Sequence, residues 1–130
     1  SPLTDATRNI VNAEALALMP NGSYVINTAR GGLIDEQALL DAVVSGHIAG
    51  AGIDTFASEP PGPDHIFFSQ PNIVMTPHIG GVTAEANARV GTDALRGIFQ
   101  IIDGQPVAPE RIINREFLAA DAAHLTSVEK

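Results

Sequence analysis

Four residues whose side chains can do chemistry follow short apolar runs of this chain: Arg30, Asp54, Glu59 and His78. The runs cover residues 23–27, 48–53 and 72–76, and each has the length of a buried strand. In open α/β sheets the ligand crevice lies outside the carboxyl ends of the strands. We therefore expect the four side chains to converge on one small volume. Such a group would combine a receptor for an anion with a proton donor and acceptor.

Arg30 stands alone as a cation in an acidic stretch. It is the single Lys or Arg between residues 9 and 88, and the whole chain has a formal net charge of -8. Nucleic-acid binding needs a basic face that neutralises phosphates, so we expect no nucleic-acid partner. Arg30 itself has two readings. It is either a surface side chain or a fixed receptor whose planar guanidinium matches a carboxylate through paired hydrogen bonds.

The composition is that of a globular chain about one domain in size, with 130 residues, 45% of them hydrophobic and 17% charged. It contains no cysteine, which excludes disulfides and cysteine-ligated metals, and its His, Asp and Glu residues show no convincing metal-ligand spacing. No apolar run approaches the ~18 residues of a membrane span, and the N-terminus lacks the features of a signal peptide. We therefore expect a cytoplasmic protein with neither a metal ion nor a membrane partner.

Apolar patterning and capping residues predict alternating strands and helices. The predicted strands cover residues 23–27, 48–54 and 72–76, and the predicted helices cover residues 13–19, 36–45 and a stretch from Val82 or Thr83 to about Asp103. Asn12 and Asp35 are expected to cap the first two helices. This alternation implies right-handed crossovers and a parallel sheet, so the predicted fold class is α/β.

Other parts of the chain carry weaker signals. Residues 57–71 contain four prolines and read as a long functional loop, and residues 105–130 read as an irregular tail. Gly50 and Gly52 weaken their strand, so we expect something to approach it closely. The wide apolar stripe of the last helix is expected to pack on another domain or subunit. Three histidines without a partner pattern are read as surface or loop residues: His47, His65 and His124.

Four segments resemble the D-isomer-specific 2-hydroxyacid dehydrogenases: Pro2–Thr7, Asn27–Glu36, Gly52–Pro60 and Thr76–Gly81. The match runs almost continuously to about residue 104, with several ordered motifs at consistent spacing. That family has two Rossmann-like domains with the active site between them. The resemblance implies that residues 1–81 are the C-terminal half of the NAD-binding Rossmann domain, a partial parallel sheet. Residues 82–130 would hold a long crossover helix and a tail that returns to the substrate domain.

The resemblance also implies the roles of the site residues. His78 would be the acid/base, Glu59 its carboxylate partner, and Arg30 the group that binds the substrate carboxylate. Contacts to the cofactor, NAD or NADP, are implied for a larger set: Thr7, Thr28, Ala29, Arg30, Asp54, His78, Gly80 and Gly81. Without the resemblance, His78 reads as a histidine at a strand end, Glu59 as a solvated loop residue and Asp54 as a turn residue.

The implied function is an oxidoreductase that transfers a hydride between NAD(P) and a D-2-hydroxy acid or 2-oxo acid. The alternative is an NAD-sensing relative of the corepressor type that binds cofactor without turnover. Phosphoglycerate, glyoxylate, hydroxypyruvate and lactate all stay open as substrates. The phosphate-binding G-x-G-x-x-G turn is not in these 130 residues, so we expect the chain alone to be inactive and to bind cofactor weakly. We also expect it to self-associate as a homodimer.

Overall fold

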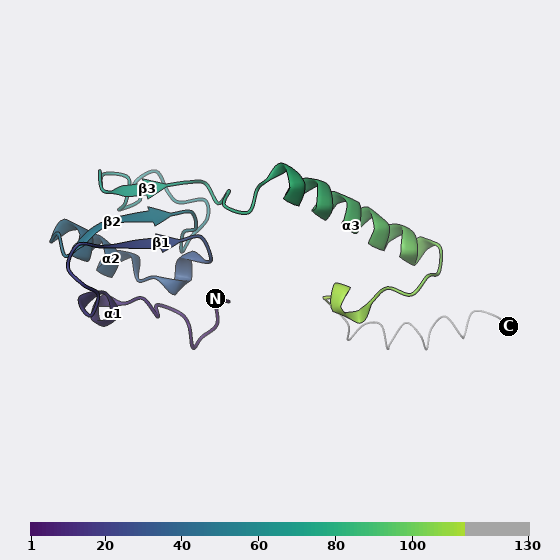
Figure 1. The fold of residues 1–130 in the computed structure, drawn as a ribbon, viewed down its shortest axis with the longest axis horizontal. Coiled ribbons are helices and arrows are strands. Elements are labelled where there is room, and N and C mark those ends of the chain that lie inside the picture. Colours follow the sequence, from purple (N-terminus) through teal and green to yellow (C-terminus); the bar gives the residue numbers. More distant parts are fainter. Residues whose placement is uncertain (114–130) are drawn as a thin grey trace. The chain divides into compact units, whose positions relative to one another are not determined.

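The computed structural model describes residues 1–113 of the chain. The chain divides into two compact units, with the boundary between Val82 and Thr83. The first unit carries a small sheet with two helices, and the second begins with a long helix (Figure 1).

The sheet of the first unit has three parallel strands, β1 (Ser23–Asn27), β2 (Ile48–Ile53) and β3 (Ile73–Met75), in the order β1-β2-β3. This confirms the predicted α/β class with a parallel sheet. The register pairs Asn27 with Ile53, and Ile53 with Met75. The three strands therefore end in one row, and the residues that follow them leave the sheet at the same edge (Figure 1).

The two helices of this unit begin where their capping residues predict. α1 (Ala13–Ala17) is capped by the Asn12 side chain, which accepts a hydrogen bond of 2.9 Å from the Ala15 N–H. α2 (Glu36–Val44) is capped by Asp35, which accepts one of 3.1 Å from the Ala38 N–H. α1 ends two residues earlier than the prediction, because Met19 bonds back to the Leu16 carbonyl in a tighter turn.

The core lies on one face of the sheet. α2 packs on β2 and on α1, and its Leu39 and Val43 are buried together with Val25 of β1 and Ile73 of β3. Apolar side chains on the opposite face remain exposed: Tyr24, Ile26 and Val74. Only one face of the sheet is thus covered within residues 1–82.

At two glycines another backbone segment comes very close. A Cβ on Gly31 would lie 1.9 Å from the Phe56 carbonyl carbon and 2.3 Å from the Ala57 nitrogen. A Cβ on Gly50 would lie 2.7 Å from the Asn72 carbonyl oxygen, which confirms the predicted close approach at that strand. The prediction is wrong for Gly52, where a Cβ would make ordinary contact at 3.7 Å with Ile26.

The second unit begins with α3 (Ala84–Ile102), whose N-terminus is capped by the Thr83 hydroxyl. The predicted irregular tail contains a short 3-10 turn, η2 (Pro109–Arg111), and its part beyond residue 113 lies outside the described residues. The apolar residues of the α3 stripe are exposed: Val90, Leu95, Ile98, Phe99, Ile101 and Ile102. The partner predicted for this stripe stays a prediction.

The contact at Gly31 predicts a strong effect of a single methyl group. Gly31→Ala should lower the free energy of unfolding by about 3 kcal/mol, the upper part of the range for overpacking, because the opposing atoms belong to the backbone and cannot rotate away. Gly62→Ala is the matched control, since a Cβ there has no heavy atom within 4 Å. Urea unfolding of both variants checks this, and equal stability of the two would contradict it.

Candidate active site

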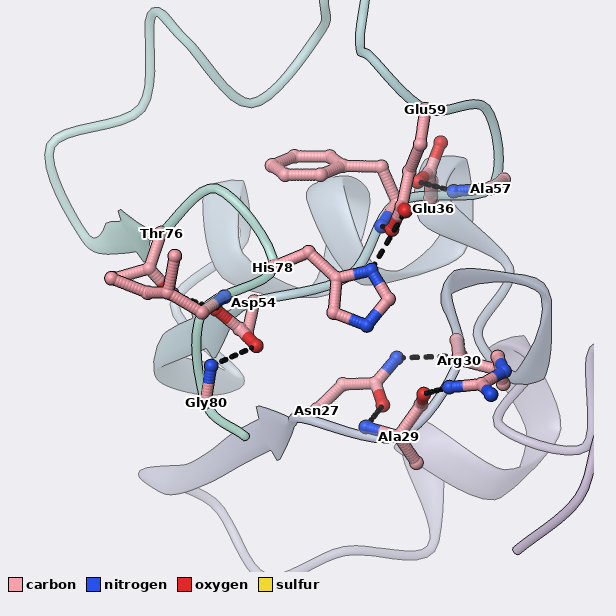
Figure 2. Close-up of polar contacts among 12 residues, drawn as sticks. Asn27, Ala29, Arg30, Glu36, Asp54, Ala57, Glu59, Thr76, His78 and Gly80 are labelled. Carbon is pink, nitrogen blue, oxygen red and sulfur yellow. Dashed lines mark hydrogen bonds and ion pairs between the residues drawn. The ribbon is translucent and has the colours of Figure 1, made fainter. Parts of the chain in front are cut away.

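The residues that leave the three strand ends come together at one edge of the sheet (Figure 2). His78, after β3, and Glu59, after β2, are in direct contact, with 2.8 Å between His78 Nδ1 and Glu59 Oε2. Their side chains are 46% and 36% exposed, so the pair can be reached by a small molecule. The contact joins residues 19 positions apart in the chain.

Glu59 is held in place from two sides. Its Oε2 contacts His78, and its Oε1 accepts a hydrogen bond of 2.9 Å from the Phe56 N–H. The hydrogen bond with His78, followed by that from Phe56, holds the pKa of Glu59 below its ordinary value, with smaller contributions from the charges of His78 and Arg30. Glu59 is therefore ionised at neutral pH. A carboxylate only accepts hydrogen bonds, so Nδ1 of His78 carries the hydrogen between the two residues.

The turn that carries His78 is built around the carboxylate of Asp54. This carboxylate accepts hydrogen bonds from the Ile79 N–H at 2.9 Å, the Gly80 N–H at 2.8 Å and the Thr76 hydroxyl. His78 has a positive φ of 54°, in the left-handed region that non-glycine residues seldom adopt. The turn thus directs the imidazole toward Glu59 at the cost of local backbone strain.

Asp54 is a buried charge, with the residue only 4% exposed. The hydrogen bond from Thr76, followed by those from Gly80 and Ile79, lowers the pKa of Asp54 below its ordinary value of 3.8. Gly80 is needed because a Cβ there would lie 2.9 Å from Asp54 Oδ2, whereas Gly81 faces open space. The contacts of Asp54, Gly80 and Gly81 with the nicotinamide stay predictions.

The loop after β1 presents Arg30. The Asn27 side chain accepts a hydrogen bond of 3.0 Å from the Ala29 N–H and donates one of 2.9 Å to the Arg30 carbonyl (Figure 2). Arg30 is exposed, and its Nη1 donates to the Ala29 carbonyl at 2.8 Å. Sequence reasoning missed Asn27, although a polar residue that ends a buried strand is a usable signal.

Two pockets border these residues. One, of about 550 Å³, lies beside the Glu59–His78 pair and is lined mainly by apolar residues: Phe56, Pro60, Pro61, Phe68, Met75, Thr76 and Pro77. The other, of about 500 Å³, is lined by the first residues of the chain and by Thr28, Ala29 and Arg30. Thr7 is not in this lining, and its hydroxyl donates to the Pro2 carbonyl at 2.8 Å within the N-terminal turn. Its contact with the cofactor stays a prediction.

Two of the histidines read as surface or loop residues have partners. His65 lies in the loop after β2, but its side chain is only 12% exposed and its Nε2 lies 3.3 Å from Glu36 Oε2. His47 Nε2 lies 3.0 Å from the Leu16 carbonyl oxygen. His65 is thus a loop residue, as predicted, but it has a partner because the loop folds back onto α2, while His124 lies outside the described residues.

The model of a known protein family matches residues 1–80, and its description is the NAD-binding domain of the D-isomer specific 2-hydroxyacid dehydrogenases. The chain belongs to this family. The prediction from the four sequence segments is confirmed. The family description names an NAD-binding domain, so NAD is the cofactor of this family.

Individual relatives agree with this assignment. A hydroxypyruvate reductase of Thermotoga maritima is 51% identical over 102 residues, which cover 76% of this chain and 33% of the relative. A D-lactate dehydrogenase structure from Treponema pallidum aligns with a TM-score of 0.76 at 33% identity, covering 82% of this chain and 36% of the other. A family structure from Xanthobacter autotrophicus in complex with NADPH and MES has a TM-score of 0.66 at 38% identity, with 85% and 47% covered. The chain thus spans between about a third and a half of these proteins.

Within residues 1–113 of this family member, no group of three or more His, Asp or Glu side chains is arranged to hold a metal ion. The described site offers a cation, a carboxylate–imidazole pair and backbone donors.

The environment of Asp54 predicts a pH-dependent contribution to stability. Because its pKa is lowered in the folded state, the charged group stabilises the fold above pH 3.8, and this stabilisation is lost as the pH falls through the folded-state value. Asp54→Asn should therefore be clearly less stable than the parent at pH 7, and the difference should shrink in strong acid. Asp41→Asn, on the exposed side of α2, is the control. Urea titrations across pH check this, and a constant difference would contradict it.

Proposed function

We propose that the protein carrying this chain transfers a hydride between NAD(P) and a D-2-hydroxy acid or its 2-oxo acid, with His78 as acid/base. The observation that carries the proposal is the 2.8 Å contact between His78 and an ionised Glu59. A histidine oriented by a carboxylate is suited to give and take a proton near neutral pH. Membership of a dehydrogenase family supports the same reaction class.

His78 would act through Nε2, because its Nδ1 is committed to Glu59. In Figure 2 the second ring nitrogen lies on the side of the imidazole away from Glu59. In the reductive direction, Nε2 donates a proton to the 2-oxo oxygen, and in the oxidative direction it removes the proton from the 2-hydroxyl group. Glu59 keeps the ring in this tautomer and stabilises the imidazolium while it exists. A bound nicotinamide supplies or accepts the hydride at C2 of the substrate.

Arg30 would bind the substrate carboxylate. It is the single Lys or Arg between residues 9 and 88, it is exposed, and its charge contributes to the lowered pKa of Glu59. A guanidinium can hold a carboxylate through two parallel hydrogen bonds and so fix the direction of the neighbouring 2-oxo group. Thr28 and Ala29 line the same pocket as Arg30, and they would provide contacts to the cofactor.

Other properties of the whole protein stay predictions. The relatives' names differ in their substrates, including hydroxypyruvate and D-lactate, so the choice among 2-hydroxy acids is open. No helix among the described residues is long and apolar enough to cross a membrane. The cytoplasmic location and the homodimer stay predictions. Turnover of a 2-oxo acid with NADH separates the dehydrogenase from the NAD-sensing alternative, in which cofactor would bind without reaction.

The acid/base role predicts a selective defect when His78→Asn is made in the full-length protein that carries this chain. Asparagine is tolerated at positive φ, so the turn around Asp54 should persist. We expect kcat to fall by about 10²- to 10⁴-fold, the usual contribution of general acid–base catalysis, with little change in the NADH dissociation constant. Steady-state kinetics and fluorescence titration measure the two quantities. An equal loss of both would mean that His78 is structural.

The anion-receptor role predicts that Arg30→Lys is not a neutral change. A lysine keeps the charge but loses the planar pair of donors, so KM for the 2-oxo acid should rise about ten-fold or more. Arg89→Lys, at an exposed position of α3, is the matched control. Kinetics with saturating NADH check this, and an unchanged KM would remove Arg30 from the substrate site.

A further inference from the structure

We propose that Glu36, backed by His65, is a positioning residue that holds Glu59 against His78. The catalytic meaning of this role rests on the proposed function. Glu36 is the first residue of α2, and its carboxylate binds Ala57 and His65 rather than the Glu59–His78 pair. It would act through the peptide segment that the two carboxylates share.

That segment is Phe56–Ala57, in the loop that follows β2. The Phe56 N–H donates to Glu59 Oε1 at 2.9 Å, and the next N–H along the chain, that of Ala57, donates to Glu36 Oε1 at 2.9 Å (Figure 2). Consecutive amides are thus bound by two carboxylates, one fixed on a helix and one in the site. Because a peptide unit is planar and rigid, the Ala57 N–H cannot move without moving the carbonyl of Phe56.

Gly31 packs against the same segment from another direction. Its Cα lies so close to the Phe56–Ala57 peptide that an added Cβ would overlap it, at 1.9 Å from the Phe56 carbonyl carbon. The segment is therefore held between the 3-10 turn that contains Gly31 and the carboxylate of Glu36. This fixes the Cα of Phe56, and with it one end of the preceding peptide, whose N–H donates to Glu59 Oε1.

His65 keeps Glu36 in this position. Its Nδ1 accepts a hydrogen bond of 3.3 Å from the Phe67 N–H, so Nε2 carries the ring hydrogen and donates it to Glu36 Oε2 at 3.3 Å. The imidazole packs edge-on against Phe56 and Phe67, with both centroid distances 5.1 Å. Glu36 is 20% exposed, so its carboxylate is largely shielded from water and its partners are protein groups.

A role limited to starting α2 does not account for these contacts. The N-terminus of α2 is already capped by Asp35, whose Oδ1 accepts the Ala38 N–H at 3.1 Å. Both oxygens of Glu36 bond to residues of the loop after β2, 21 and 29 positions away. Gln37, the next residue of the helix, bonds instead to Asp41 within α2 and gives a matched control.

The first test does not depend on activity. Amide hydrogen exchange at Phe56 and Ala57 is measured by NMR in the parent protein, Glu36→Ala, Glu36→Gln and Gln37→Ala. We expect Glu36→Ala to accelerate exchange at both amides by about ten-fold, the factor for one lost hydrogen bond to a charged group. Glu36→Gln keeps an acceptor for Ala57 and should stay closer to the parent, and Gln37→Ala should match it. Faster exchange at Ala57 alone, with Phe56 unchanged, would overturn the proposal.

The second test is kinetic. Glu36→Ala should lower kcat by about ten-fold or more, as expected when a reacting group is displaced, while the NADH dissociation constant changes little. If Glu36 acts through Glu59, Glu36→Ala should cause no further loss in a Glu59→Gln background, whereas full additivity would overturn the proposal. The kinetic measurements use the full-length protein that carries this chain. Absence of any 2-oxo acid turnover in that full-length protein would instead reject the proposed function, and the exchange experiment would still decide the positioning role.

Discussion

The buried carboxylate of Asp54 is the contact on which the arrangement of the site depends. It stands at the exit of β2 and binds Thr76, Ile79 and Gly80, all in the segment that leaves β3. A charge buried without partners would be strongly destabilising, so its three hydrogen bonds must form together with the fold. The same contacts close the turn that gives His78 its positive φ. The position of the imidazole is thus set by a neighbouring strand as well as by its own.

The partner of His78 is placed by a separate set of contacts. Glu59 belongs to a loop with little regular structure, yet the Phe56–Ala57 peptide before it is held against Gly31 and bonded to Glu36. His78 and Glu59 therefore meet from segments that follow two different strands. A carboxylate supports each segment, that of Asp54 for His78 and that of Glu36 for Glu59. Both supports use backbone amides, which have fewer degrees of freedom than side chains. The result is a hydrogen-bonded pair that is more than a third exposed and still well oriented.

Part of the apolar surface of the chain has no cover among the described residues. A parallel sheet is usually covered on both faces, and here Tyr24, Ile26 and Val74 leave one face bare within residues 1–82. The chain spans 33% of the Thermotoga hydroxypyruvate reductase and 36% of the Treponema D-lactate dehydrogenase. Substrate choice and assembly stay predictions, whereas the contacts of the Glu59–His78 pair and of Arg30 lie within this portion.

Local chemistry was enough to locate most elements from the residues alone. Side chains such as Asn12, Asp35 and Thr83 cap the helix that follows them, and a cap needs only the next three residues. Short apolar runs likewise marked the strands, and ordered motifs marked the family and the residues Arg30, Glu59 and His78. The strand ends then placed these residues at one edge, since parallel strands share a direction.

The supports of the site were decided only by the tertiary structure. Glu36 bonds to Ala57 across 21 positions and Asp54 to Gly80 across 26, and neither spacing has a period that a sequence pattern could display. His65 shows no partner pattern in the sequence because its aromatic neighbours and its carboxylate partner meet only after the loop folds back on α2. The reason for a glycine at position 31 becomes visible only when another backbone segment packs against it. A hydrogen bond or a steric contact depends on distance in space, and for these residues the folded chain alone sets that distance.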